Sequence, residues 1–153
     1  MLMSVRFSTK DMTEHTLQQK LIAEFIGTFF LTLTICLTAV FGSSSSTHPA
    51  FPIAATLMVM IYGLGHISGA HFNPAVTMGI WIRGACDKSD VLPYIATQVI
   101  AGIFGARVSI LIYTEEYQIP LEAVSLLSSH NYSPVLLAEL LFTFALVFVI
   151  LNV

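Results

Sequence analysis

The residues best suited to chemistry lie in one polar, glycine-rich segment, 65–77, which reads GHISGAHFNPAVT and occurs once in the chain. Long apolar runs precede and follow it. Unpartnered backbone N–H and C=O groups are costly in lipid. Irregular backbone at membrane depth is therefore tolerated only where protein buries it or where it lines a water-filled path. The segment predicts a permeation pathway.

A short helix is predicted to follow this turn. Asn73 is a good N-cap, and Pro74 suits the first helical position because that residue needs no amide partner. The ten residues from Pro74 to Arg83 would form about 15 Å of helix, about half of a bilayer core. We therefore predict a re-entrant half-helix over 74–83, with its N-terminus at the membrane midplane and Arg83 complementing the negative end of its dipole.

The chemistry predicted for this site is hydrogen bonding to a passing solute along Asn73-Pro74-Ala75. The Asn73 side-chain amide would donate to a solute oxygen, and the half-helix N-terminus adds a positive partial charge. A strand-like segment before it would expose a ladder of carbonyl acceptors, from Gly69, Ala70, His71 and Phe72. Such a line favours a neutral hydrogen-bonding solute and repels a cation.

Other interpretations of these residues are less well supported. Asn-Pro alone is an ordinary turn dipeptide. His66 and His71 are five residues apart, which is not the spacing of a metal site on one helix face. An anion at the half-helix N-terminus is physically possible, but no Lys or Arg lies close before it. No nucleophile–base pair is recognisable, so the sequence predicts neither an enzyme, nor a metal site, nor a cofactor.

The composition indicates a membrane protein. Apolar residues make up 56% of the 153 residues, charged residues only 10%, and the mean hydropathy is +0.82; a soluble domain carries roughly a quarter charged residues. The net charge of −3 argues against nucleic-acid binding. Four segments are apolar enough to be predicted spans: 21–41, 51–67, 91–113 and 134–153. The first is too long for the apolar region of a signal peptide. The predicted class is therefore an all-α membrane protein.

The charges predict how the chain crosses the membrane. Cations lie in the tail 1–20 and between the second and third spans, whereas the loop 114–133 carries three glutamates and no Lys or Arg. Because cytoplasmic loops are enriched in Lys and Arg, we expect 1–20 to be a cytoplasmic tail and 114–133 an extracytoplasmic loop. The protein would then be a multi-pass protein of the cell (inner or plasma) membrane.

The segment 65–77 resembles the first signature of the aquaporin, or major intrinsic protein, family, and its amino-acid sequence is most similar to that of bacterial water channels. The run AEFIGT at 23–28 is similar to the opening helix of that family, and Tyr94, Gln98 and Gly102 fit its third span. The resemblance implies a right-handed bundle of six helices and two half-helices. It also implies a tetramer in the lipid bilayer and passive passage of water or a small neutral solute such as glycerol.

The resemblance also implies roles for two residues outside the signature. It assigns Glu24 to bracing the re-entrant loop through hydrogen bonds to the backbone; the alternative is an interfacial ion pair with Lys20, one turn earlier. Ile53 stands twenty residues before Asn73, at the selectivity-filter position where water channels of the family place an aromatic residue. That difference weakens any expectation of selectivity for water alone.

An internal repeat is visible in the sequence itself. Residues 23–37 and 138–152 are identical at Ala, Glu, Thr, Phe, Leu and Ile, and Glu24 aligns with Glu139. Glu139 is therefore predicted to brace a loop as Glu24 does. Three predicted spans are crossed from the start of the first copy to the start of the second, counting the first span and excluding the last. The second copy should therefore be inverted, as in inverted-repeat channels.

The family's second Asn-Pro-Ala half-helix does not occur in these 153 residues. The expectation is therefore a first aquaporin repeat over 21–113, followed by the first helix of a truncated second repeat at 134–153. On this reading the chain is the N-terminal half of an aquaporin-type channel. The alternative is a non-conducting membrane subunit or remnant that associates with full-length channels.

Overall fold

The computed structural model describes residues 15–40, 48–117 and 132–152, and these residues form helices and short connections without a strand. The helices in chain order are α2 (Leu17–Ile35), α3 (Ala50–Ser68), α4 (Pro74–Ile82), α5 (Lys88–Tyr117) and α7 (Tyr132–Asn152). A π-helical turn, η1 (Cys36–Val40), continues α2. The prediction of an all-α protein is confirmed.

With η1 counted as part of the first helix, the helix ends differ from the predicted spans by up to four residues, and capping residues set two of these ends. Thr16 and Gln19 form a capping box, with the Thr16 side chain accepting from Gln19 N. α2 therefore begins at Leu17, inside the predicted tail 1–20. α3 ends at Ser68 and is capped by Gly69, whose φ of 86° is the left-handed conformation typical of a helix C-cap. Most of the predicted tail and of the loop 114–133 lies outside the described residues.

Among the residues that the structure describes, three helices are long and apolar enough to cross a membrane: Leu17–Val40, Ala50–Ser68 and Lys88–Glu115. Their large apolar side chains are widely exposed on the outside of the bundle; Leu92 on α5, for example, is 74% exposed. Surfaces of this kind are stable in lipid and not in water. The chain is therefore a multi-pass membrane protein.

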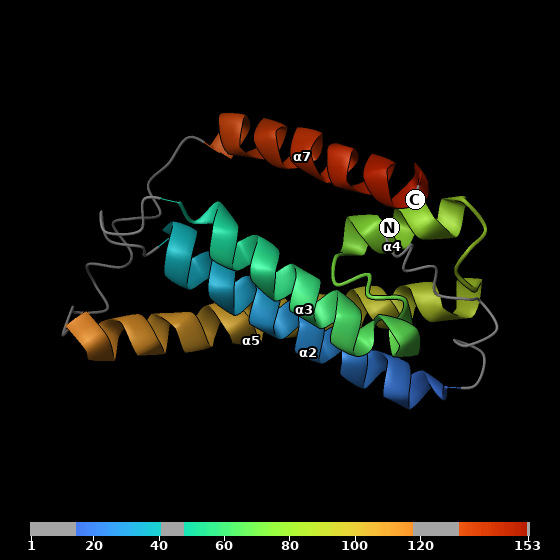
Figure 1. Cartoon of the computed structure of the whole chain (residues 1–153), viewed down its shortest axis with the longest axis horizontal. Helices are drawn as coiled ribbons and strands as arrows, with labels where there is room; N and C mark the ends of the chain where they lie inside the picture. The colour runs from blue at the N-terminus through green and yellow to red at the C-terminus, as the bar shows by residue number, and fades with distance from the viewer. Residues whose placement is uncertain (1–14, 41–47, 118–131, 153) are drawn as a thin grey trace, which may run out of the picture.

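Helix α2 lies between α3 and α5 and packs against both (Figure 1). Its approach to α5 is close at Gly105, where an added Cβ would lie 2.8 Å from the carbonyl oxygen of Phe29. α7 runs in the direction opposite to α2 (Figure 1), which is the orientation that the internal repeat predicts.

Helix α4 is the shortest of these α-helices and lies between α5 and α7 (Figure 1). Figure 1 shows that the chain turns back into the bundle after α3 and that α4 then runs outward to the end where α5 begins. α4 packs against α5 and α7. It therefore has the course of a re-entrant half-helix, and its nine residues, Pro74–Ile82, nearly match the predicted 74–83.

Candidate functional site

The connection between α3 and α4 is left-handed at three of its residues. Gly69, Ala70 and Phe72 have φ values of 86°, 54° and 49°. The prediction of a strand-like segment is wrong here, because positive φ excludes an extended chain. Non-glycine residues in this region are strained by about 1–3 kcal/mol each, so the surrounding contacts must hold them.

Glu24 supplies many of these contacts. Its side chain is 0% exposed. One carboxylate oxygen accepts from Ser68 Oγ (2.6 Å) and from the backbone amide of His71 (2.9 Å). The other accepts from the amide of Phe72 (2.7 Å) and from Gln98 Nε2 (2.8 Å). A carboxylate is an acceptor-only group when ionised, so four converging donors match it and fasten the connection to α2 and α5.

The connection is asymmetric in its hydrogen bonding. All four of its amides donate inward: Gly69 N to Gly65 O, Ala70 N to Ser68 Oγ, and His71 N and Phe72 N to Glu24. No described residue donates to the four carbonyl oxygens of 69–72. Those carbonyls therefore retain their acceptor capacity, and a ligand or water can satisfy it.

The orientation of the Asn73 amide follows from its capping role. Its Oδ1 accepts from the backbone amide of Ala75 at 2.8 Å, and Pro74 occupies the first helical position. Because Oδ1 is engaged, Nδ2 is the group that remains available, and no described residue accepts from it. A partly exposed donor therefore lies at the positive end of α4.

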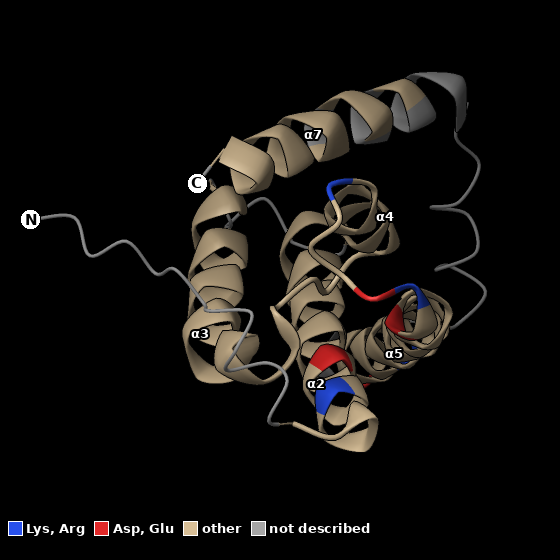
Figure 2. Cartoon of the chain, turned by 90° about the vertical axis from the view of Figure 1, so that its right-hand side faces the viewer, with Lys and Arg blue, Asp and Glu red and all other residues tan. Residues whose placement is uncertain are grey.

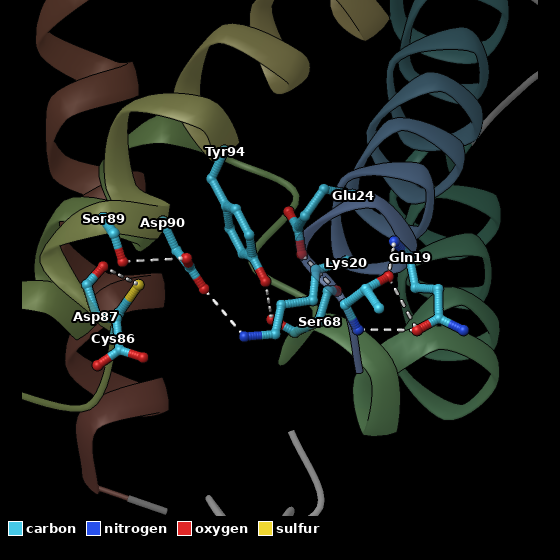
Figure 3. A network of polar contacts seen from close by, with 10 residues as sticks. Gln19, Lys20, Glu24, Ser68, Cys86, Asp87, Ser89, Asp90 and Tyr94 are labelled. Carbon is cyan, nitrogen blue, oxygen red and sulfur yellow. Dashed lines mark hydrogen bonds and ion pairs between the residues drawn. The ribbon is translucent and has the colours of Figure 1, made fainter. Parts of the chain in front are cut away.

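A buried polar network supports this arrangement from α5. Gln98 Nε2 donates to Thr77 Oγ1 (2.9 Å) as well as to Glu24, and Thr77 Oγ1 lies 3.1 Å from His71 Nδ1. The Tyr94 hydroxyl donates to the carbonyl of Ser68 at 2.9 Å, a contact drawn in Figure 3. The network thus joins α2, the end of α3, α4 and α5 at one point.

The Phe72 ring packs against Gly27 of α2, a residue without a side chain. A Cβ added to Gly27 would lie 2.1 Å from Cε1 of the Phe72 ring, and Phe72 is only 3% exposed. Glu24 and Gly27 are less than one helical turn apart. Helix α2 therefore holds Phe72 by its backbone amide and by its ring.

A cluster of charges lies at the end of the bundle where α2 and α5 begin and α4 ends (Figure 2). Lys20 Nζ and Asp90 Oδ2 are 3.0 Å apart, and both side chains are 15% exposed. The alternative that pairs Lys20 with Glu24 is therefore wrong: Glu24 faces the re-entrant connection, and Lys20 turns to α5 (Figure 3).

Comparison with known proteins identifies the family. The family model described as "Major intrinsic protein" matches residues 11–153. The chain belongs to the major intrinsic protein family. It is 43% identical over 96 residues to Aquaporin Z of Photorhabdus laumondii subsp. laumondii, an alignment covering 59% of this chain and 42% of that protein. It is 40% identical over 106 residues to Aquaporin NIP1-1 of Arabidopsis thaliana, covering 66% of this chain and 36% of that protein. The matched part is thus less than half the length of either relative.

The predicted site residues of this major intrinsic protein fall into two groups. Glu24 and 69–75 come together around the start of α4. Ile53 lies partly buried on α3, about 22 Å from Ser68 by helical rise. The side chain of Glu139 lies outside the described residues, so its bracing role stays a prediction.

Sequence reasoning assigned no role to Ser68, Thr77 or Asp90, although each contributes to the network or to its charged end. A spacing signal for Asp90 was present. Asp90, Tyr94 and Gln98 recur every four residues, which places three polar side chains on one face of α5. A polar stripe on an apolar helix indicates contact with other polar groups inside the protein.

Proposed function

We propose that this chain forms part of an aquaporin-type passage through which water or small neutral solutes such as glycerol cross a membrane passively. Two features at the N-terminus of α4 carry the proposal: the Nδ2 donor of Asn73 and the four carbonyls of 69–72, none of which has a partner among the described residues. A solute that both donates and accepts hydrogen bonds matches this pairing.

Electrostatics supports the choice of a neutral solute. The N-terminus of α4 carries a positive partial charge that opposes a cation. Residues 69–72 include no Lys or Arg that could hold an anion. Ile53 at the filter position leaves more space than an aromatic ring. We therefore expect glycerol-sized solutes to be accepted as well as water.

The assembly proposed for this passage follows the family resemblance. It is a homo-oligomer in the lipid bilayer of the cell (inner or plasma) membrane, a tetramer as in aquaporins, with Lys20 and Arg83 on the cytoplasmic side. By its equivalence to Glu24 in the internal repeat, Glu139 would brace a corresponding loop. The channel activity is passive, with no enzymatic step.

Stopped-flow shrinkage of proteoliposomes containing the chain tests conduction. We expect a water permeability above that of empty vesicles, and glycerol uptake above the same baseline. Asn73→Asp should abolish it, because a carboxylate removes the donor and places a negative charge in the path. Gln18→Glu, the same change on the exposed first turn of α2, is the matched control and should leave permeability unchanged.

Permeability equal to that of empty vesicles for the unmodified chain would overturn the conducting role. The chain would then be better described as a non-conducting membrane subunit, and co-purification with a tagged full-length channel would test that description. Equal permeability of Asn73→Asp and the unmodified chain would show that Asn73 does not line the path.

A further inference from the structure

Helices α4 and α7 are fastened to each other at two successive turns. A Cβ added to Gly79 on α4 would lie 2.5 Å from Val147 Cγ1 on α7. One turn later the guanidinium of Arg83 donates to the carbonyl oxygen of Leu151. Since the step is four residues on both helices, α4 and α7 run parallel along this contact, as Figure 1 also shows.

Parallel packing brings two C-terminal helix ends together. Arg83 is the C-cap residue of α4, and Leu151 lies in the last turn of α7. Each end exposes carbonyls with a negative partial charge, so the two ends repel each other unless a cation lies between them. The Arg83 guanidinium, carried by the C-cap residue of α4 and bonded to the carbonyl oxygen of Leu151, places a positive charge where these ends meet.

The described polar contacts of α4 are concentrated at its two ends and reach different neighbours. Near its start, Thr77 bonds to Gln98 on α5. At its finish, Arg83 bonds to α7. Between these fastenings Gly79, Met78 and Ile80 offer no polar group on a side chain. The direction of the α4 axis therefore depends on both ends being held.

We propose that Arg83 is a positioning residue that pins the end of the half-helix α4 to the end of α7 and so fixes where the Asn73 amide lies. α4 is a rod of about 13 Å, so tilting it by roughly 10° would move one end relative to the other by about 2 Å. A shift of that size exceeds the tolerance of a hydrogen bond. For solute passage this role rests on the proposed function, but the positioning of α4 itself does not.

The chain carries its own probe for this positioning. Trp81, the single tryptophan, lies on α4 two residues before Arg83 and is 36% exposed. Its fluorescence therefore reports on α4 alone. The full chain in detergent or lipid vesicles is compared with Arg83→Met, which keeps the side-chain length and removes the charge and donors, and with Arg83→Lys, which restores a cationic donor. Lys88→Met, the loss of an exposed cation at the start of α5, is the matched control.

We expect Arg83→Met to raise the acrylamide quenching constant of Trp81 about threefold and to lower its fluorescence anisotropy, because a freed end loses a stabilising charge–dipole contact. Arg83→Lys should restore most of the difference, and Lys88→Met should match the unmodified chain. Far-ultraviolet circular dichroism identifies any variant that is unfolded. For such a variant, Arg83→Gln, which keeps a donor without the charge, replaces methionine and should give the same increase.

The proposal is overturned if the charge-removing variant folds and leaves Trp81 quenching unchanged, or if Arg83→Lys behaves like it. A fourth measurement, glycerol and water flux in proteoliposomes, separates this inference from the proposed function. A change in Trp81 quenching in a chain that never conducts supports the positioning role and refutes the conducting one. In a conducting chain, Arg83→Met should reduce flux and Arg83→Lys should restore it.

Discussion

The carboxylate of Glu24 accepts a hydrogen bond of 2.7 Å from the backbone amide of Phe72, 48 positions further along the chain. This bond links a transmembrane helix to a residue held at a φ of 49°. Positive φ at a bulky residue is unfavourable on its own. The bond to Glu24 and the packing of the Phe72 ring against Gly27 together keep that conformation.

Glu24→Gln should destabilise the protein. The substitution replaces one acceptor oxygen with an NH2 group, which would face donors now bonded to the carboxylate. At least two buried donors then lack an acceptor, and each costs about 1–3 kcal/mol. Unfolding followed by circular dichroism in mixed detergent should show a loss of more than about 2 kcal/mol.

The matched control is Glu115→Gln, the same change at an exposed position near the end of α5. It should alter the free energy of unfolding by less than about 0.5 kcal/mol. Equal effects of the two substitutions would show that Glu24 is not the acceptor that holds the connection.

Gly27→Ala should also destabilise the fold, through packing. The new methyl would lie 2.1 Å from the Phe72 ring, so the ring or α2 must shift. Overpacking of this kind costs typically about 1–3 kcal/mol. Gly63→Ala is the control, because nothing lies within 4 Å of a Cβ there; it should be neutral or stabilising by about 0.5–1 kcal/mol through reduced chain entropy. Thermal unfolding in detergent measures both, and a neutral Gly27→Ala would contradict the placement of Phe72.

The ion pair of Lys20 and Asp90 should show measurable coupling. The two charges are 3.0 Å apart and only 15% exposed, so water screens them less than a surface pair, for which about 0.2–1 kcal/mol is typical. A double-mutant cycle of Lys20→Met and Asp90→Asn should give a coupling energy of about 1 kcal/mol, decreasing with added salt. Additive effects would mean that the contact contributes nothing to stability.

Local rules predicted the start of α4 well and the connection before it poorly. Asn73 and Pro74 signal a helix start through side chains that act on the next few residues, so the position of α4 was visible in the sequence. The φ values of Ala70 and Phe72 were not visible, because neither residue favours them. They depend on Glu24, which is distant in sequence. The contact of Arg83 with Leu151 was hidden for the same reason, since Arg83 was assigned only to the dipole of its own helix.

Cys86, between α4 and α5, should react slowly with maleimides in the folded protein. Burial, with the nearby carboxylates of Asp90 and Asp87 as further causes, raises the pKa of the Cys86 thiol from 9.0 to about 11. The thiolate is the reactive form. At pH 8 its population is therefore about a hundredfold smaller than in the unfolded chain. In a Cys36→Ser background, which leaves Cys86 as the single cysteine, mass spectrometry gives the labelling rate against pH.

Because the folded-state pKa is the higher one, the rate should rise about tenfold per pH unit through pH 9 and level off only near pH 11. In the detergent-unfolded chain it should level off near pH 9. Asp90→Asn should speed labelling of the folded protein, since it removes a negative charge beside the thiol and frees Lys20 to approach it. Levelling off at pH 9 in the folded chain would contradict the burial of Cys86 beside α5.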